Sequence, residues 1–160
     1  MGEKIYHLII RFSDNLFGVG DVIARHNEVI EKYDAVWFGK LGIPLSQKRI
    51  DILNEQISKN ITTTLYLIKG SRSKSTAYQA AIIHLTKEQP SSETNLFPPY
   101  YLEKGICEYI KTWIKVIQIS PIEMSFFNNF RVVNSVFPIQ ETLLRSSSGH
   151  FFIQETNLLF

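Results

Sequence analysis

Hydrophobic and polar positions change their spacing several times along the first part of the chain, and each change predicts a different element. Residues 4–12 (KIYHLIIRF) are almost continuously apolar, β-branched or aromatic, which predicts a buried strand. A polar stretch punctuated by glycine follows at residues 13–20 and predicts a loop. Asp21 is a suitable N-cap, and apolar side chains then recur at helical spacing up to Tyr33. The pattern therefore predicts a strand, a loop and an amphipathic helix.

The middle of the chain predicts a second helix and then two long strands. Residues 35–38 (AVWF) are short and extended. After a glycine–proline turn, Ser46 caps a helix that ends near residue 57. Residues 62–70 and 76–88 predict two strands joined by the basic connection SRSKS.

The last part of the chain predicts more strands than helices. Residues 89–104 contain three prolines, so no regular element is expected there, although the stretch is rich in aromatic side chains. Residues 110–120 alternate apolar and polar positions, which favours a strand with one wetted face. Residues 121–130 predict a short helix or turn, and residues 131–137 and 150–155 predict the final short strands.

The order of these elements predicts the fold class. Because hairpin-length turns join most neighbouring strands, we expect mostly antiparallel pairing. The expected architecture is α/β (α+β), a curved, mixed and largely antiparallel sheet or small barrel with two or more packed helices.

Composition narrows the function classes without selecting one. A chain of 160 residues predicts a single domain, residues 1–160. The net charge of +2 is too small to indicate nucleic-acid binding by itself, although a local basic face would indicate it. The single cysteine, Cys107, excludes an internal disulfide and suits the reducing cytoplasm. No signal-peptide pattern and no apolar run of 18 residues occurs, so we expect no membrane partner.

No arrangement of residues indicates catalysis or a bound metal. The four histidines are His7, His26, His84 and His150, and none lies at metal-ligand spacing from another. Gly18 and Gly20 begin like a dinucleotide-binding loop, but the third glycine is missing. Asp21 at the helix cap would also compete with a phosphate for the same amides. We therefore expect a binding domain with no cofactor and no metal rather than an enzyme.

Aromatic and basic side chains also occur where the hydrophobic periodicity does not require them. The aromatic group is Trp37, Phe38, Phe97, Tyr100 and Tyr101. The basic residues that we assign to phosphate binding are Arg11, Lys40, Lys69, Arg72 and Lys74. Basic side chains attract phosphates independently of sequence, and aromatic faces stack on an extruded base with roughly 1–3 kcal/mol per base. The combination favours a nucleic-acid-binding protein that flips a base.

Each of these features also has a structural interpretation, which the sequence leaves open. Trp37 can be a core residue at the start of a strand, and Tyr100 with Tyr101 can anchor a long loop to the sheet. The SRSKS connection can be a soluble hairpin turn without a ligand. Lys48 and Arg49 lie on a predicted helix, where basic side chains more often form a solvated face than a contact to DNA.

The order of elements over residues 35–85 resembles the YTH/EVE group of PUA-like domains. In YTH domains a Gly-Val-Trp element leads through a short turn to a helix, and then to a strand, a hairpin and a strand. Here Val36-Trp37 stands before the helix that begins LSQKRIDILNEQI. Residues 112–124 resemble the next strand of the group and the segment after it. The chain is also similar to the N-terminal specificity domains of McrB-type, modification-dependent restriction systems.

This resemblance implies a PUA-like fold with an aromatic cage around a modified base. Trp37 would form the first wall of the cage. The second wall would come from the loop after the hairpin's return strand, where the candidates are Phe97, Tyr100 and Tyr101. Phe38 follows the tryptophan, whereas YTH domains have a small residue there.

The resemblance also implies which residues contact the edge of the base. Arg11, Ser13 and Asp14 occupy that place, whereas YTH domains have a Lys-Ser-Asn run. An aspartate accepts from an exocyclic amine, while an asparagine both donates and accepts. Together with Phe38, this departure puts N6-methyladenine in RNA in doubt and leaves the identity of the modified base open.

We therefore expect a DNA-binding specificity domain that recognises a methylated base in duplex DNA by flipping it into an aromatic cage. We expect the chain to be the N-terminal part of a longer protein of a modification-dependent restriction system, with GTPase or nuclease partner modules, because it ends on the apolar run NLLF. Two alternatives stay open, a YTH-like reader of methylated RNA and a protein-interaction module. Binding through phosphates weakens steeply with salt, which separates the nucleic-acid readers from the protein-interaction module.

Overall fold

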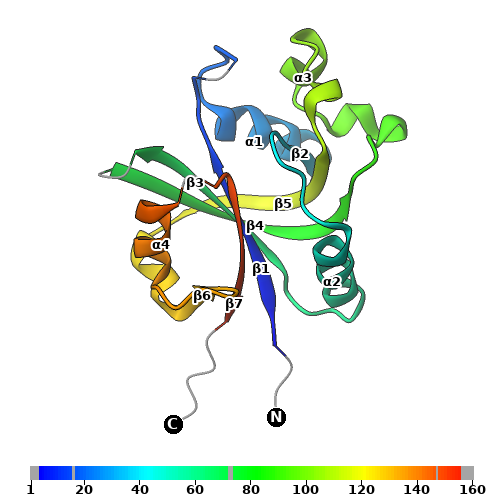
Figure 1. Ribbon diagram of the computed structural model, residues 1–160. Coiled ribbons are helices and arrows are strands. Elements are labelled where there is room, and N and C mark those ends of the chain that lie inside the picture. Colours follow the sequence, from blue (N-terminus) through cyan, green and yellow to red (C-terminus); the bar gives the residue numbers. More distant parts are fainter. Residues whose placement is uncertain (1–3, 16, 72–73, 147, 156–160) are drawn as a thin grey trace.

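The computed structural model describes residues 4–15, 17–71, 74–146 and 148–155, and their strands form one seven-stranded sheet (Figure 1). The strands are β1 (Tyr6–Phe12), β2 (Val36–Lys40), β3 (Thr64–Ser71), β4 (Lys74–Thr86), β5 (Thr112–Ile122), β6 (Phe130–Val132) and β7 (His150–Glu155). Their order across the sheet is β2-β5-β4-β3-β1-β7-β6. The β1–β3 pair is parallel and the other pairs are antiparallel. The expected curved, mixed and largely antiparallel sheet is confirmed.

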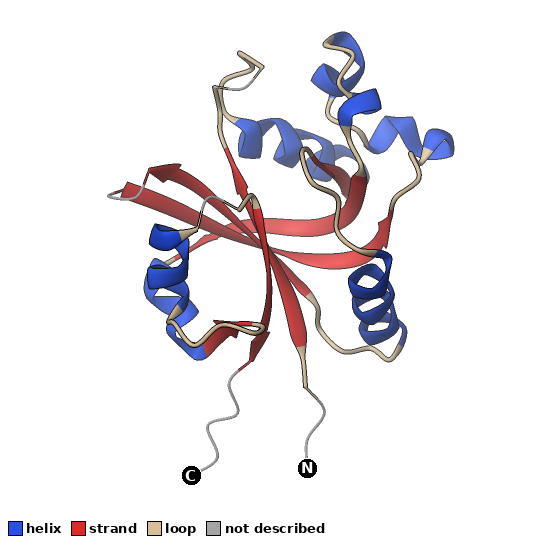
Figure 2. Cartoon of the chain, in the orientation of Figure 1, coloured by secondary structure: helices blue, strands red, loops and turns tan. Residues whose placement is uncertain are grey.

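Helices surround this sheet (Figure 2). The α-helices are α1 (Val22–Tyr33), α2 (Gln47–Ser58), α3 (Pro99–Glu103) and α4 (Ile139–Arg145), and the 3-10 helices are η1 (Ser91–Leu96), η2 (Cys107–Tyr109) and η3 (Met124–Asn129). Both expected N-caps are confirmed. The Asp21 carboxylate accepts from the amide of Ala24 at 3.0 Å, and the Ser46 hydroxyl accepts from the amide of Arg49 at 3.3 Å.

Two side-chain amides fasten α2 to the sheet. Asn54 donates to the carbonyl oxygen of Leu85 at 2.8 Å and accepts from its amide at 3.0 Å. Gln56 makes the same two-way contact with the backbone of Tyr6, at 2.9 and 2.7 Å. These contacts satisfy backbone groups at the ends of β4 and β1 and thereby fix the position of α2.

Three hydrophobic clusters fill the space between the sheet and its helices. The first lies beneath α1 and α2 and includes Ile50, Leu53 and Phe152. The second lies beneath η3 and α4, so that α2 and α4 occupy opposite sides of β1 and β7 (Figure 1). The third lies beneath the segment from η1 to η2, which we call the covering segment (residues 91–109). This third cluster determines what happens to the aromatic residues of the predicted site.

The structure departs from the sequence pattern at two places. Residues 89–104 contain η1 and α3, although no regular element was expected there. The prolines permit this because Pro99 is the first residue of α3, where its missing amide hydrogen costs nothing. Of the strand expected at residues 131–137, only the start belongs to β6, and α4 follows after Pro138.

Candidate functional site

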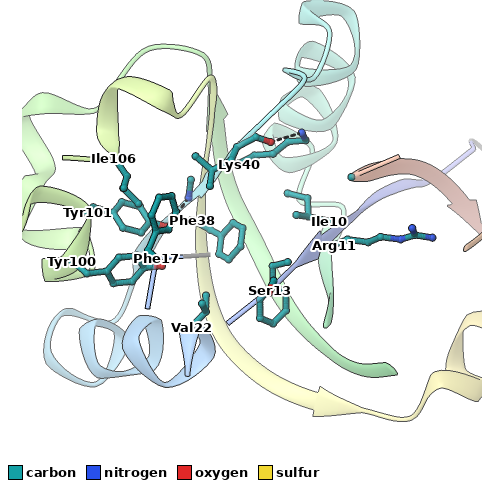
Figure 3. A pocket seen from close by; sticks show the side chains of 14 residues that line it. Ile10, Arg11, Ser13, Phe17, Val22, Phe38, Lys40, Tyr100, Tyr101 and Ile106 are labelled. Atoms are coloured by element: carbon teal, nitrogen blue, oxygen red, sulfur yellow. Dashed lines mark hydrogen bonds between the residues drawn. The ribbon is translucent and has the colours of Figure 1, made fainter. Parts of the chain in front are cut away.

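A cavity of about 120 Å³ lies between the end of β1 and the end of β2 (Figure 3). We call it the β1–β2 pocket. Its lining residues are Ile10, Arg11, Phe12, Ser13, Phe17, Val22, Phe38, Gly39, Lys40, Leu41, Tyr100, Tyr101, Ile106 and Gly149. The predicted site residues that the structure brings together here are Arg11, Ser13, Phe38, Lys40, Tyr100 and Tyr101.

The pocket exists because β1 and β2 do not pair with each other, and the side chains between them leave a cavity. Among the described strands, β2 pairs with β5, whereas β1 pairs with β3 and β7. Val22, the first residue of α1, and Phe17, in the loop before it, lie at the same gap. The covering segment closes the opposite wall with Tyr100 and Tyr101. The cavity therefore lies where the two strands end.

Buried hydrogen bonds set the position of Tyr101 on the pocket wall. The Nδ1 atom of His26 lies 2.8 Å from the carbonyl oxygen of Val22, and because a carbonyl oxygen only accepts, Nδ1 carries the proton. The Tyr101 hydroxyl therefore donates to Nε2 of His26 at 2.7 Å and accepts from the Gly39 amide at 2.9 Å. Burial lowers the pKa of His26 to about 4, so the imidazole is neutral at pH 7 and the hydrogen bonds keep these directions.

Five of the fourteen residues that line the pocket are aromatic. The Phe38 ring packs against the His26 imidazole with centroids 4.9 Å apart, and the Tyr100 ring meets Tyr101 edge-on at 5.0 Å. Two more phenylalanines in the lining are Phe12 and Phe17. Burial raises the pKa of Tyr100 to about 12, so its hydroxyl keeps its proton at neutral pH. The pocket can therefore hold a flat apolar ring beside a hydroxyl that donates or accepts.

Trp37 is not among the residues that line this pocket, and the expectation that its indole forms an open wall of the cage is wrong. Side chains alternate along a strand, so Trp37 points to the face of β2 opposite Phe38. The covering segment packs on it and leaves 2% of the residue exposed. The Lys115 ammonium lies 5.7 Å from the centre of the indole ring, whose Nε1 is buried without a hydrogen-bond partner. Trp37 is a core residue.

Phe97 also lies in the third cluster and not in the pocket lining. Its ring stacks on Trp113 with centroids 4.7 Å apart and planes inclined by 27°. Tyr100 and Tyr101 are buried in the same cluster, so the interpretation that they anchor the segment to the sheet is confirmed. These two tyrosines differ from Phe97 because they also face the pocket.

The Arg11 side chain is turned away from the aromatic walls (Figure 3). Its guanidinium donates to the carbonyl oxygens of Leu143 and Ser146 at the end of α4, and it lies 5.2 Å from the centre of the Phe151 ring. A cation at the C-terminal end of a helix satisfies carbonyls that have no partner within the helix. The structure thus gives Arg11 backbone partners in place of the phosphate that we expected.

Asp14 and Lys69 were expected to contact a base edge and a phosphate, but they bind each other. The Nζ atom of Lys69 lies 2.8 Å from Oδ2 of Asp14, and Oδ1 accepts from the amide of Val22 at 3.0 Å. Burial alone would raise the pKa of Asp14, yet the hydrogen bonds from Lys69 and Val22 outweigh it and lower the pKa. The pair ties the loop after β1 to β3 and to the start of α1. Ser13 stays exposed at the edge of the pocket.

The remaining basic residues of the expected phosphate site divide into two groups. Lys40 lines the pocket, and its buried Nζ donates to the carbonyl oxygens of Leu41 and Ile43. Burial lowers the pKa of Lys40. Arg72 lies outside the described residues, and Lys74 is described only as the first residue of β4, so both stay predictions.

His26 and Phe17 are the site residues that the sequence pattern missed. From the sequence, His26 was one position of the predicted amphipathic helix and a histidine without a second metal ligand nearby. Its place among apolar residues was the available signal, because a ring nitrogen buried in a core needs a hydrogen-bond partner. Phe17 stands alone in a polar, glycine-rich loop, where a large ring has no periodic reason to be.

Comparison with known proteins gives one positive result. The family model described as Pua-like matches residues 8–155. Searches of curated proteins and of solved structures found no significant match. Among the described helices, none combines the length and the apolar character that a bilayer crossing requires. The described residues also contain no group of three or more His, Cys, Asp and Glu side chains that could hold a metal ion.

Proposed function

The chain belongs to the PUA-like family, whose members generally bind nucleic acids or modified bases, and from this premise we propose that its β1–β2 pocket receives one modified nucleobase. The matched residues, 8–155, include both strands that border the pocket and the tyrosines that close it. The proposal concerns a binding domain, with any catalysis in other domains or subunits.

The observation that carries the proposal is the aromatic lining at the point where β1 and β2 end. A nucleobase is flat and apolar on its faces, with hydrogen-bonding groups along its edge. Phe38, Tyr100 and Tyr101 offer aromatic surface, and the hydroxyls of Ser13 and Tyr100 are polar groups for the base edge. Their rings replace Trp37 and Phe97 as the proposed cage walls, because those two do not line the pocket.

The size of the pocket limits the ligand to a single ring system. At about 120 Å³ the cavity is far larger than the roughly 10–15 Å³ that one water needs. It is also smaller than the roughly 300–1,000 Å³ of pockets for drug-sized ligands. A base from a duplex would have to leave its stack to enter, which costs a few kcal/mol and is offset by stacking on the pocket walls.

Within this proposal, the ligand is a methylated base in duplex DNA, and the domain supplies specificity to a modification-dependent restriction system of the McrB type. GTPase or nuclease modules would then be its partners. The proposal includes a cytoplasmic location. A chain with a single cysteine has no internal disulfide and suits that reducing compartment. The YTH-like alternative, a reader of methylated RNA, uses the same pocket and differs in the nucleic acid that it prefers.

A protein-interaction role is the second candidate function, and a different surface favours it. Large apolar side chains are exposed around η3 and α4, where Val136 is 93% and Leu144 is 47% exposed. Phe126 and Phe137 are partly exposed in the same region. An apolar interface there would be insensitive to salt, whereas phosphate-driven binding weakens as salt rises.

The proposed function is tested by replacing Tyr100 and measuring base preference. Fluorescence anisotropy would compare short labelled duplexes with one methylated base against unmodified duplexes, and against single-stranded methylated RNA. We expect Tyr100→Leu to reduce the ratio of affinities for methylated and unmodified duplexes by roughly tenfold, because stacking is worth roughly 1–3 kcal/mol per base. Tyr109→Leu is the matched control, since Tyr109 lies on the same segment but is 61% exposed and outside the pocket lining.

The results separate the candidates. Stronger binding of wild type to methylated RNA than to any duplex would favour the YTH-like alternative. Equal binding of the wild type to every methylated and unmodified oligonucleotide would reject the pocket as a base site. A loss of preference in Tyr109→Leu equal to that in Tyr100→Leu would show that the effect is not specific to the pocket.

A further inference from the structure

Two cationic side chains and a histidine lie beside the β1–β2 pocket, and each of the three comes from a different element. Lys40 ends β2 and lines the pocket, Arg49 stands in the first turn of α2, and His150 begins β7. His150 pairs with Ile10, itself a pocket residue, across the β1–β7 ladder. The guanidinium of Arg49 lies over the ring of Phe152, at 4.9 Å from its centre. Phe152 is two positions after His150, so both side chains point to the same face of β7.

These groups have hydrogen-bond donors to spare. The Lys40 ammonium has three donors, and two of them are used by the carbonyl oxygens of Leu41 and Ile43. Within the described part of the chain, the Arg49 guanidinium makes no hydrogen bond or ion pair, and its recorded contact is the ring of Phe152. The imidazole of His150 likewise has no hydrogen-bond partner among the described residues, where its contacts to Ser148 use the backbone.

Among the described residues, no ion pair with a carboxylate is recorded for this cluster, whereas four other cations have one. Lys69 pairs with Asp14, Lys115 with Glu93, Lys59 with Glu55 and Arg25 with Glu28. The charges that act on His150 are instead those of Lys40 and Arg49, from β2 and α2, and Arg11 on β1 is committed to the end of α4. Burial, together with those two cations, lowers the pKa of His150 to about 4. An anion placed among the three groups would offset the repulsion between a protonated His150 and the charges of Lys40 and Arg49.

We propose that Lys40, Arg49 and His150 form a binding site for one phosphodiester group at the mouth of the pocket. The proposal rests on the proposed function, because it assigns to this site the backbone phosphate next to the base in the pocket. A phosphate accepts hydrogen bonds from all three groups and needs no carboxylate nearby. The N-terminal end of α2, which has no acidic residue in its first turn, adds a positive partial charge of the same sense.

The site predicts a distinctive pH dependence. His150 has a pKa of about 4 without ligand, and an anion beside the imidazole favours its protonated form, so binding raises this pKa. Affinity for a phosphodiester should therefore increase as the pH falls through the ligand-bound pKa toward the ligand-free pKa of about 4. A phosphodiester remains a monoanion throughout this range, so the titration belongs to the protein.

The test uses two probes, dimethyl phosphate and the labelled duplex. NMR titration of the His150 ring would give its pKa with and without dimethyl phosphate, and we expect a rise of about one pH unit, equal to a tenfold tighter complex with the protonated form. Arg49→Gln should abolish most of the rise. In duplex binding, Arg49→Gln should reduce the slope of log affinity against log salt by about one. Lys48→Gln, which removes the same charge from the neighbouring exposed residue, should change neither.

The outcomes separate this site from the base pocket. An unchanged His150 pKa in saturating dimethyl phosphate overturns the phosphate site, whatever the duplex does. A normal rise in a protein that binds no oligonucleotide keeps the phosphate site and rejects the proposed function. If Arg49→Gln and His150→Gln both keep the wild-type duplex affinity and salt slope, the phosphate site is rejected. The base pocket is kept if Tyr100→Leu still loses the preference for the methylated base.

Discussion

Trp37 and Phe38 are neighbours on β2, yet their side chains lie in different surroundings on the two faces of the strand. Trp37 faces the third hydrophobic cluster, where the covering segment seals it. Phe38 faces the first cluster and also borders a cavity, because the adjacent space toward β1 is not filled by a paired strand. One position along the chain therefore separates a ring sealed in a hydrophobic cluster from a ring that lines a cavity.

The two faces also differ in how their polar atoms are satisfied. On the pocket side, His26, Tyr101 and the Gly39 amide form a closed set of hydrogen bonds. On the sealed side, the Trp37 Nε1 has no hydrogen-bond partner, and Lys115 lies over the indole. A buried network with fixed donors and acceptors holds its side chains in one arrangement. We infer that the pocket walls are positioned by hydrogen bonds and the sealed face mainly by packing.

The largest expected effect comes from removing the Trp37 side chain from the third hydrophobic cluster. We expect Trp37→Ala to lower the free energy of unfolding by about 3–5 kcal/mol, because it leaves a large cavity in a packed cluster. Urea unfolding followed by circular dichroism measures the loss. Where the variant stays folded, its preference for a methylated base should match that of wild type. A stable Trp37→Ala protein that has lost base preference would contradict the division between the two faces.

Acid should lower the free energy of unfolding through protonation of His26, which holds the pocket wall. Its pKa is about 4 in the folded protein and 6.5 ordinarily, so the unfolded chain takes up the proton first as the pH falls. The contribution of His26 is therefore complete above pH 6.5 and is lost as the pH falls from 6.5 to about 4. At about 1.4 kcal/mol per pKa unit, the loss approaches roughly 3 kcal/mol. Urea unfolding across this range measures it.

His150 also has a pKa of about 4, so the matched background for this measurement is His150→Gln. We expect most of the acid sensitivity to persist there, since His26 is fully buried whereas His150 is partly exposed. Stability that does not change between pH 6.5 and pH 4 in His150→Gln would show that the His26 network does not hold the wall.

The smallest expected effect concerns the charge over the sealed face. Lys115 lies 2.7 Å from a Glu93 carboxylate oxygen and joins β5 to η1 of the covering segment. We expect Lys115→Met to lower the free energy of unfolding by at most about 1 kcal/mol, because partly exposed ion pairs and cation–π contacts contribute little. Lys104→Met, at an exposed position, is the matched control. A larger loss would mean that the ion pair, and not packing, closes the segment over Trp37.

Local patterns in the sequence determined most of the fold. The caps at Asp21 and Ser46, the apolar spacing of α1 and the strand runs of β3 and β4 are all properties of neighbouring residues, and each predicted its element. The aromatic and basic residues of the pocket, such as Phe38, Tyr100 and Lys40, were also visible as a group. Residue type and spacing are sufficient for these conclusions because helices and strands have fixed periods.

Tertiary structure decided which members of that group line the pocket. Whether Trp37 is covered depends on a segment more than fifty residues away, and the Asp14–Lys69 pair joins residues 55 positions apart. Arg49 of α2 and His150 of β7 are far apart in sequence, and they come close because α2 packs on the sheet face to which Phe152 of β7 points. Burial and charge pairing arise from contacts between distant residues, so the periodicity of the chain does not specify them.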